Sequence, residues 1–214
     1  MKIALLGASG RIGHCILQEA LSRGHQVTAV VRDPARLGSP PEGVKVVTGN
    51  VLDPSGLAGR VAGHDAVVSA IGPHLPDGDP QVVVQAANSL VEGVSISGTF
   101  RLVVVGGAGS LEVAPGVQLV DTPEFPAAWK PIALAHREAL AIYQAADDFI
   151  DWTYVSPSAL IEPGPRTGSF RVGTNQLLTD AKGESRISME DYAVALVDEL
   201  EKPQFVRQQM TVGY

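Results

Sequence analysis

The sequence is poor in cysteine, in aromatic residues and in long apolar segments. Cys15 is the one cysteine among 214 residues, which excludes a disulfide within the chain and fits a reducing compartment. The apolar segments are shorter than the roughly 20 residues of a transmembrane helix, and the residues after Lys2 do not read as a signal peptide. We therefore expect a cytoplasmic protein that does not contact a membrane.

Basic residues are also few. Lys and Arg number 16 against 23 Asp and Glu, and the resulting net charge of −7 provides no electrostatic footprint for nucleic acid. No group of His, Cys, Asp and Glu has metal-ligand spacing, so no metal site is expected. The absence of Gly-x-Ser-x-Gly argues against an α/β-hydrolase. The expected partner is a small-molecule substrate, and the chain is expected to be a monomer or a homodimer.

What is present is an alternation of short apolar segments with helix-period segments over the first 155 residues. The expected strands are residues 3–6, 27–31, 44–47, 66–68, 102–105 and 152–155. The expected helices are residues 11–23, a short helix after 53–54, 81–94 and 131–146. Strands without polar alternation are buried on both faces, and their alternation with helices predicts parallel βαβ units. The predicted fold is α/β, a Rossmann-type doubly wound parallel sheet.

The last 59 residues break this pattern. Proline and glycine are frequent between Pro157 and Gly173, which predicts a loop-rich segment. Ser188 is the expected N-cap of a helix that continues to about Glu201, and residues 211–212 are expected to form a closing edge strand. We expect one domain over residues 1–214, in which residues about 157–190 and the C-terminal helix form a small substrate lobe.

A Gly-x-x-Gly-x-x-Gly loop lies directly between the first strand and the first helix. Gly7 allows a sharp turn, Gly10 lets the backbone approach a pyrophosphate, and Gly13 permits close packing of helix on strand. The N–H groups at the start of the helix can then bind the phosphates. A glycine-rich turn without a ligand is the alternative, which the position after a buried strand disfavours. The predicted cofactor-binding residues of the loop are Gly7, Ser9, Gly10, Arg11, Ile12 and Gly13.

The end of the second strand bears on the choice of cofactor. NAD sites place an acid there to bind the ribose 2′-hydroxyl, and Val31 occupies that place here. Arg11 and Arg32 would instead suit a 2′-phosphate, which favours NADP(H) over NAD(H). Asp33, one residue beyond the expected acid, complicates this reading. Arg32 and Asp33 can also be read as a solvated turn pair.

The other strand ends offer further contacts for a dinucleotide. Asp53 either binds the adenine amine or starts the following helix. Small residues after the fourth and fifth strands would leave room for the ribose and the nicotinamide. The cofactor-binding residues expected at these ends are Asp53, Ala70, Ile71, Gly72, Gly106 and Gly107.

Two residues are candidates for catalysis, and two for the substrate pocket. His136 can donate a proton near neutral pH, or can be an exposed helix histidine. Ser110 can hydrogen-bond a substrate carbonyl or the carboxamide, or can cap the segment that follows. Phe125 and Trp129 lie in a proline-rich loop of a chain with 5% aromatic residues, and they can stack an aromatic acceptor or anchor the loop.

Four segments together resemble the atypical short-chain dehydrogenase/reductases: residues 2–36, 102–111, 154–158 and 187–203. Within that group they are most similar to the NmrA-like, NAD(P)H-binding proteins related to flavin reductase and biliverdin-IXβ reductase. The resemblance covers nearly the whole chain. It implies a Rossmann fold with a small C-terminal substrate lobe, and NADPH-linked reduction of a flavin, quinone or similar conjugated acceptor.

The sequence departs from the wider family at the catalytic pair. No Tyr-x-x-x-Lys occurs anywhere, and His136 and Leu140 stand at the corresponding positions. Flavin-type reduction does not need this pair, because hydride passes directly between two rings and solvent supplies the proton. We therefore expect an NAD(P)H-dependent oxidoreductase. A non-catalytic NADP(H)-binding redox sensor is the alternative, and the short C-terminal lobe argues against a sugar-nucleotide epimerase.

Overall fold

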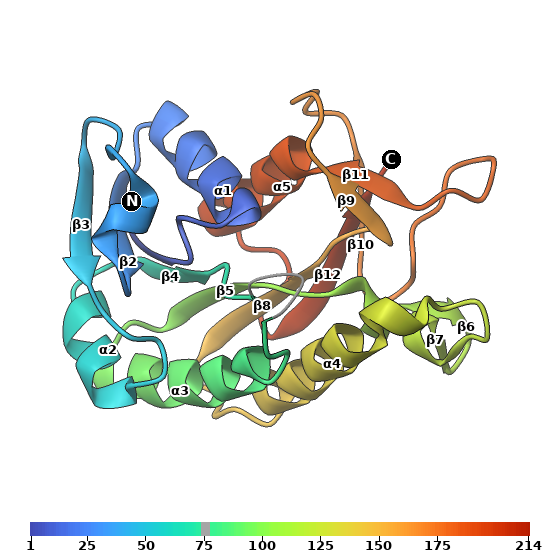
Figure 1. Ribbon diagram of the computed structural model, residues 1–214, viewed down its shortest axis with the longest axis horizontal. Helices are drawn as coiled ribbons and strands as arrows, with labels where there is room; N and C mark the ends of the chain where they lie inside the picture. The colour runs from blue at the N-terminus through green and yellow to red at the C-terminus, as the bar shows by residue number, and fades with distance from the viewer. Residues whose placement is uncertain (74–77) are drawn as a thin grey trace.

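An eight-stranded sheet lies at the centre of the computed structural model, which describes residues 1–73 and 78–214 (Figure 1). Its strand order is β10-β12-β8-β5-β4-β1-β2-β3. The strands are β1 (Lys2–Leu6), β2 (Gln26–Val31), β3 (Val44–Thr48), β4 (Ala66–Ser69), β5 (Arg101–Val105), β8 (Asp151–Ser156), β10 (Arg171–Gly173) and β12 (Gln208–Gly213). All neighbours pair in parallel except β10 and β12. The predicted Rossmann-type fold is confirmed.

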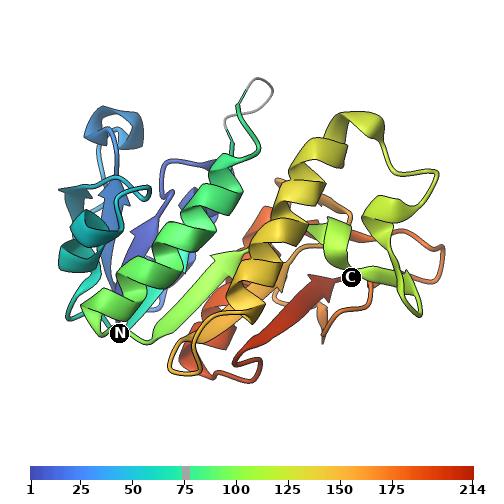
Figure 2. The ribbon, with the colours of Figure 1, turned by 90° about the horizontal axis from the view of Figure 1, so that it is seen from below.

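Helices cover both faces of this sheet (Figures 1 and 2). Helices α1 (Arg11–Ser22) and α5 (Met189–Glu201) pack on one face, and α2 (Pro54–Val61), α3 (Val82–Ser97) and α4 (Lys130–Gln144) pack on the other. Strand β1 shows why its sequence is apolar throughout. Ile3 and Leu5 contribute to the core under α1 and α5, while Ala4 and Leu6 contribute to the opposite core.

Local signals in the sequence explain where the helices begin and end. The carboxylate of Asp53 accepts a hydrogen bond from the Gly56 N–H at 3.0 Å and caps α2. The hydroxyl of Ser188 accepts from the Asp191 N–H at 3.0 Å and caps α5 as predicted. Gly24 follows α1 with a φ of +79°, which fits its predicted role as the glycine that ends this helix.

The C-terminal region differs from the expectation in two respects. Residues 211–212 belong to β12, which is not an edge strand, because the three-residue strand β10 pairs outside it. Helix α5 packs against α1 on the central sheet and does not belong to a separate lobe. The lobe is therefore limited to the segment between β8 and α5 without β10, which joins the central sheet. In this segment β9 (Leu160–Glu162) and β11 (Arg186–Ser188) pair in parallel.

Short elements connect the main ones. The hairpin of β6 (Glu112–Ala114) and β7 (Val117–Gln118) follows β5. The 3₁₀ helices are η1 (Pro34–Leu37), η2 (Ala108–Ser110), η3 (Leu119–Asp121) and η4 (Ala127–Trp129). Within residues 1–73 and 78–214, no helix is both long and apolar enough to cross a bilayer.

Candidate functional site

The glycine loop is held tightly against the ends of β1 and β4. Gly7 has a φ of +80°, and a Cβ there would lie 2.4 Å from the carbonyl oxygen of Ala70. A Cβ on Gly13 would lie 2.1 Å from the carbonyl oxygen of Gly7. Helix α1 begins after Gly10, which has no side chain to cap the first N–H groups. The loop therefore offers the uncapped helix start that a dinucleotide phosphate requires.

A cavity of about 380 Å³ lies beside this loop. Four parts of the fold line it: the glycine loop with the start of α1, the turn η1, the residue after β9, and the start of α5. Its lining residues are Ala8, Ser9, Gly10, Arg11, His14, Cys15, Arg36, Leu37, Pro163, Met189 and Glu190. The two guanidinium groups at this cavity belong to Arg11 and Arg36. Arg32, the predicted partner of Arg11, is exposed and does not line it.

The two acids near the cofactor region have structural roles. Asp33 accepts a hydrogen bond from the Ala35 N–H at 3.0 Å and caps η1. Asp53 caps α2, so the structural alternative for this residue is realised. Arg36 is not among the cofactor-binding residues predicted from the sequence. Its position in η1, directly after the Arg32–Asp33 pair, is the signal that could have identified it.

The small residues at the ends of β4 and β5 differ in their surroundings. The Ala70 N–H donates to the Leu6 carbonyl at 2.9 Å, Ile71 packs on the core under α3, and Gly72 is open. A Cβ on Gly106 would lie 2.3 Å from the ring of Tyr154, and one on Gly107 would lie 2.9 Å from His136. Glycine is thus required after β5 by packing as well as by any ligand.

His136 lies against Gly107 but does not have the predicted acid–base property. Its Nδ1 is 3.0 Å from the hydroxyl of Tyr154, and that hydroxyl donates to the His136 carbonyl at 2.8 Å. Burial lowers the pKa of His136 to about 4, because the charged imidazolium would lose its hydration. The expectation that His136 titrates near neutral pH is wrong, and the residue is a neutral imidazole there.

Ser110 is hydrogen-bonded by Gln209 and not by His136. Its hydroxyl is buried and accepts a hydrogen bond from Nε2 of Gln209 at 2.9 Å. It lines a second, polar cavity of about 480 Å³ between η2, α4 and β12, to which His136 does not contribute. The same Gln209 amide donates to Ser156 at 2.9 Å, so it connects η2 and the end of β8 to β12. The predicted catalytic roles of Ser110 and His136 stay predictions.

Phe125 and Trp129 line neither of these two cavities. Trp129 is 51% exposed and precedes α4, and Phe125 is half-buried in the preceding turn. Neither residue has a stacking partner among the ring contacts of the described residues. Their predicted stacking role stays a prediction.

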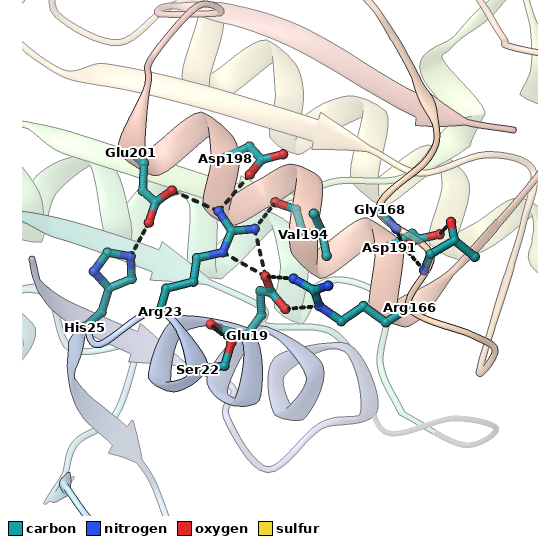
Figure 3. Close-up of polar contacts among 11 residues, drawn as sticks. Glu19, Ser22, Arg23, His25, Arg166, Gly168, Asp191, Val194, Asp198 and Glu201 are labelled. Atoms are coloured by element: carbon teal, nitrogen blue, oxygen red, sulfur yellow. Dashed lines mark hydrogen bonds and ion pairs between the residues drawn. The ribbon is translucent and has the colours of Figure 1, made fainter.

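The C-terminal lobe is anchored to the helix that follows the glycine loop (Figure 3). Glu19 on α1 is 5% exposed, and it accepts two hydrogen bonds from Arg166 at 2.7 and 2.8 Å and one from Arg23 at 2.7 Å. Asp191 on α5 accepts from the N–H groups of Thr167 and Gly168 at 2.7 and 2.8 Å. These anchors fix the segment next to Pro163, which lines the cavity.

A family model described as NAD(P)H-binding matches residues 7–203, from the first glycine of the loop to the end of α5 and beyond. The chain belongs to this NAD(P)H-binding family. Within the part of the chain that the structure describes, no group of three His, Cys, Asp or Glu side chains could hold a metal ion.

Relatives of the family match over the full length of the chain. The uncharacterized protein YwnB of Bacillus subtilis (strain 168) is 41% identical over 99% of this chain and 98% of that protein. A crystal structure from Burkholderia pseudomallei, named as a candidate exported protein, is 50% identical, with complete coverage of both chains and a TM-score of 0.92. A candidate NADH-flavin reductase from Streptococcus pneumoniae TIGR4 is 32% identical, covering 100% of this chain and 99% of its own, with a TM-score of 0.88.

Proposed function

We propose that this protein is an NADPH-dependent oxidoreductase that reduces a flavin, quinone or similar conjugated acceptor by direct hydride transfer. The observation that carries the proposal is the glycine-loop cavity with Arg11 and Arg36 on its wall. Two guanidinium groups lining one cavity suit the 2′-phosphate that NADPH has and NADH lacks, which supports NADPH. The similarity to a candidate NADH-flavin reductase supports the class of acceptor.

The residues around β5 fit a reaction in which the protein provides no acid. When bound, NADPH supplies the hydride, and a proton from water completes the two-electron reduction of the acceptor. Gly106 and Gly107 leave the end of β5 without side chains. His136 is neutral, and no Tyr-x-x-x-Lys pair exists to protonate an alkoxide. The chain's contribution is to bind and orient two planar rings and to exclude other reactants.

Steady-state oxidation of NADPH tests this proposal. We expect turnover with FMN, riboflavin or a simple quinone, and a larger thermal stabilisation by NADPH than by NADH at equal concentration. The matched control is the Gly13→Ala variant, which should neither bind nor oxidise NADPH. Absence of turnover across flavins and quinones contradicts the activity, and stronger stabilisation by NADH contradicts the choice of cofactor.

A non-catalytic redox sensor is the second candidate. The observation that favours it is the direct bonding of the lobe to α1, through Arg166 and Glu19, behind the glycine loop. A ligand that shifts the start of α1 would therefore also shift the lobe, because Arg166 is bonded to this helix. Tight NADP(H) binding without turnover, with faster or slower proteolysis of residues 163–169 on binding, would select this function.

A further inference from the structure

The hydrogen bonds between Tyr154 and His136 have a direction that their chemistry fixes. The Tyr154 hydroxyl is 2.8 Å from the His136 carbonyl oxygen and 3.0 Å from Nδ1 of the same residue. A carbonyl oxygen can only accept, so the single proton of the hydroxyl is used in that bond. The hydroxyl oxygen must then accept from Nδ1, and Nδ1 therefore carries the imidazole proton.

The opposite arrangement is unfavourable. If the hydroxyl donated to Nδ1, its oxygen and the carbonyl oxygen would face each other at 2.8 Å with no proton between them. A doubly protonated ring is also disfavoured, because burial holds its pKa near 4. A neutral imidazole has one N–H group, so Nε2 is left with a free lone pair.

The position of the ring directs this lone pair toward the end of β5. The ring atoms that a Cβ on Gly107 would meet are Cγ at 2.9 Å and Cδ2 at 3.1 Å, whereas Nδ1 faces Tyr154, so the Cδ2 edge of the ring is the one turned toward Gly107. This edge carries Nε2. The ring also lies against Gly107, two residues beyond the carboxyl end of β5, where parallel sheets bind their ligands.

We propose that Tyr154 is a positioning residue that holds His136 as the Nδ1–H tautomer, and that Nε2 of His136 accepts a hydrogen bond from an imide N–H of the bound acceptor. The nature of this ligand rests on the proposed function, but the tautomer does not. The site would then prefer acceptors with a donor group, such as an isoalloxazine, over acceptors with carbonyl groups alone.

Nitrogen NMR of the imidazole rings tests the tautomer without any ligand. In ¹⁵N-labelled protein at pH 7, we expect His136 to show a protonated Nδ1 and an unprotonated Nε2. The His136→Gln variant assigns the signal among the five histidines. The Tyr154→Phe variant, which removes only the hydroxyl, should shift the ring toward a mixture of tautomers. An Nε2–H tautomer in the wild-type protein overturns the proposal, whether or not the Tyr154→Phe variant folds.

A matched pair of ligands tests the acceptor role. In 3-methyllumiflavin a methyl group replaces the imide proton of lumiflavin, and we expect the wild-type protein with NADP⁺ to bind lumiflavin about 5- to 10-fold more tightly. The His136→Asn variant can still donate to Tyr154 but has no acceptor at Nε2, so it should bind both flavins equally. His136→Gln, whose longer amide reaches the Nε2 position, should retain part of the preference.

The outcomes separate this proposal from the proposed function. Equal binding of both flavins by the wild-type protein, or a preference that His136→Asn leaves unchanged, overturns the acceptor role of His136. Failure of lumiflavin to bind overturns the flavin as its ligand. NADPH turnover with quinones alone, combined with the expected tautomer, would retain the role of Tyr154 and the reductase function while excluding the imide.

Discussion

Glycine at position 13 is required by a contact rather than by its backbone conformation. A Cβ there would lie 2.1 Å from the Gly7 carbonyl oxygen, which belongs to the backbone of the loop and cannot turn away. Gly13→Ala should therefore lower the free energy of unfolding by about 2 kcal/mol or more and abolish NADPH binding. Urea unfolding and fluorescence titration with NADPH measure the two effects.

The control is Gly59→Ala, which makes the same change from glycine to alanine within helix α2. Its Cβ would meet nothing within 4 Å, so the change should be neutral or stabilise the protein by up to about 1 kcal/mol. Equal effects of the two substitutions would show that α1 tolerates a shift at Gly13.

A second prediction at the residue scale concerns the guanidinium groups of Arg11 and Arg36. Arg11→Gln and Arg36→Gln should each weaken NADPH binding about 10-fold or more, since a hydrogen bond to a charged group contributes about 1.5–3 kcal/mol. NADH binding should change little, because NADH lacks the 2′-phosphate. Arg32→Gln is the control, because Arg32 is as exposed as Arg11 and Arg36 but does not line the cavity. If Arg32→Gln alone abolishes the preference for NADPH, the interpretation from the sequence is right and the cavity assignment is wrong.

At the scale of elements, the link between α1 and the C-terminal lobe depends on one buried carboxylate. Glu19 bonds Arg23 on its own helix and Arg166 in the lobe, and these bonds, chiefly that of Arg166, lower its pKa. Glu19→Gln should lower the free energy of unfolding by about 1–3 kcal/mol, because it leaves two guanidinium groups without their shared partner. It should also speed proteolysis within residues 163–169.

Asp121→Asn provides the comparison for that experiment. Asp121 pairs with Arg137 at 2.9 Å, but the two side chains are 51% and 38% exposed. A pair so accessible to water contributes at most about 1 kcal/mol. A loss of stability in Asp121→Asn as large as that in Glu19→Gln would contradict the assigned importance of the α1–lobe link.

The elements that the sequence predicts well are those with local signals. The apolar β1 and the N-cap Ser188 each depend on neighbouring residues, and both are found where expected. Strand β12 was predicted only as residues 211–212 at an edge, because its partners β8 and β10 lie more than 30 residues away. The neutral state of His136 was missed for the same reason, since its burial depends on residues of other elements, such as Gly107 and Tyr154.

At the scale of the whole molecule, acid should destabilise the fold through groups whose pKa differs between the folded and the unfolded chain. Below pH 6.5 the unfolded chain protonates His136, whereas the folded chain keeps it neutral until about pH 4. The unfolded state therefore binds more protons, and the free energy of unfolding falls as the pH falls, by at most about 3 kcal/mol from this residue.

Buried carboxylates act in the same direction. Burial opposes ionisation of Asp191, but hydrogen bonds from Thr167, Gly168 and Tyr214 outweigh it and lower its pKa, as Arg166 does for Glu19. Each is protonated in the unfolded chain at a higher pH than in the folded chain, so their stabilising contribution is lost on acidification. Urea unfolding between pH 7 and pH 4 should show a steady loss of stability, and this loss should be shallower in His136→Gln. A flat profile in the wild-type protein would mean that His136 is protonated as readily in the folded as in the unfolded chain, which contradicts the burial and bonding that hold this ring beside Gly107.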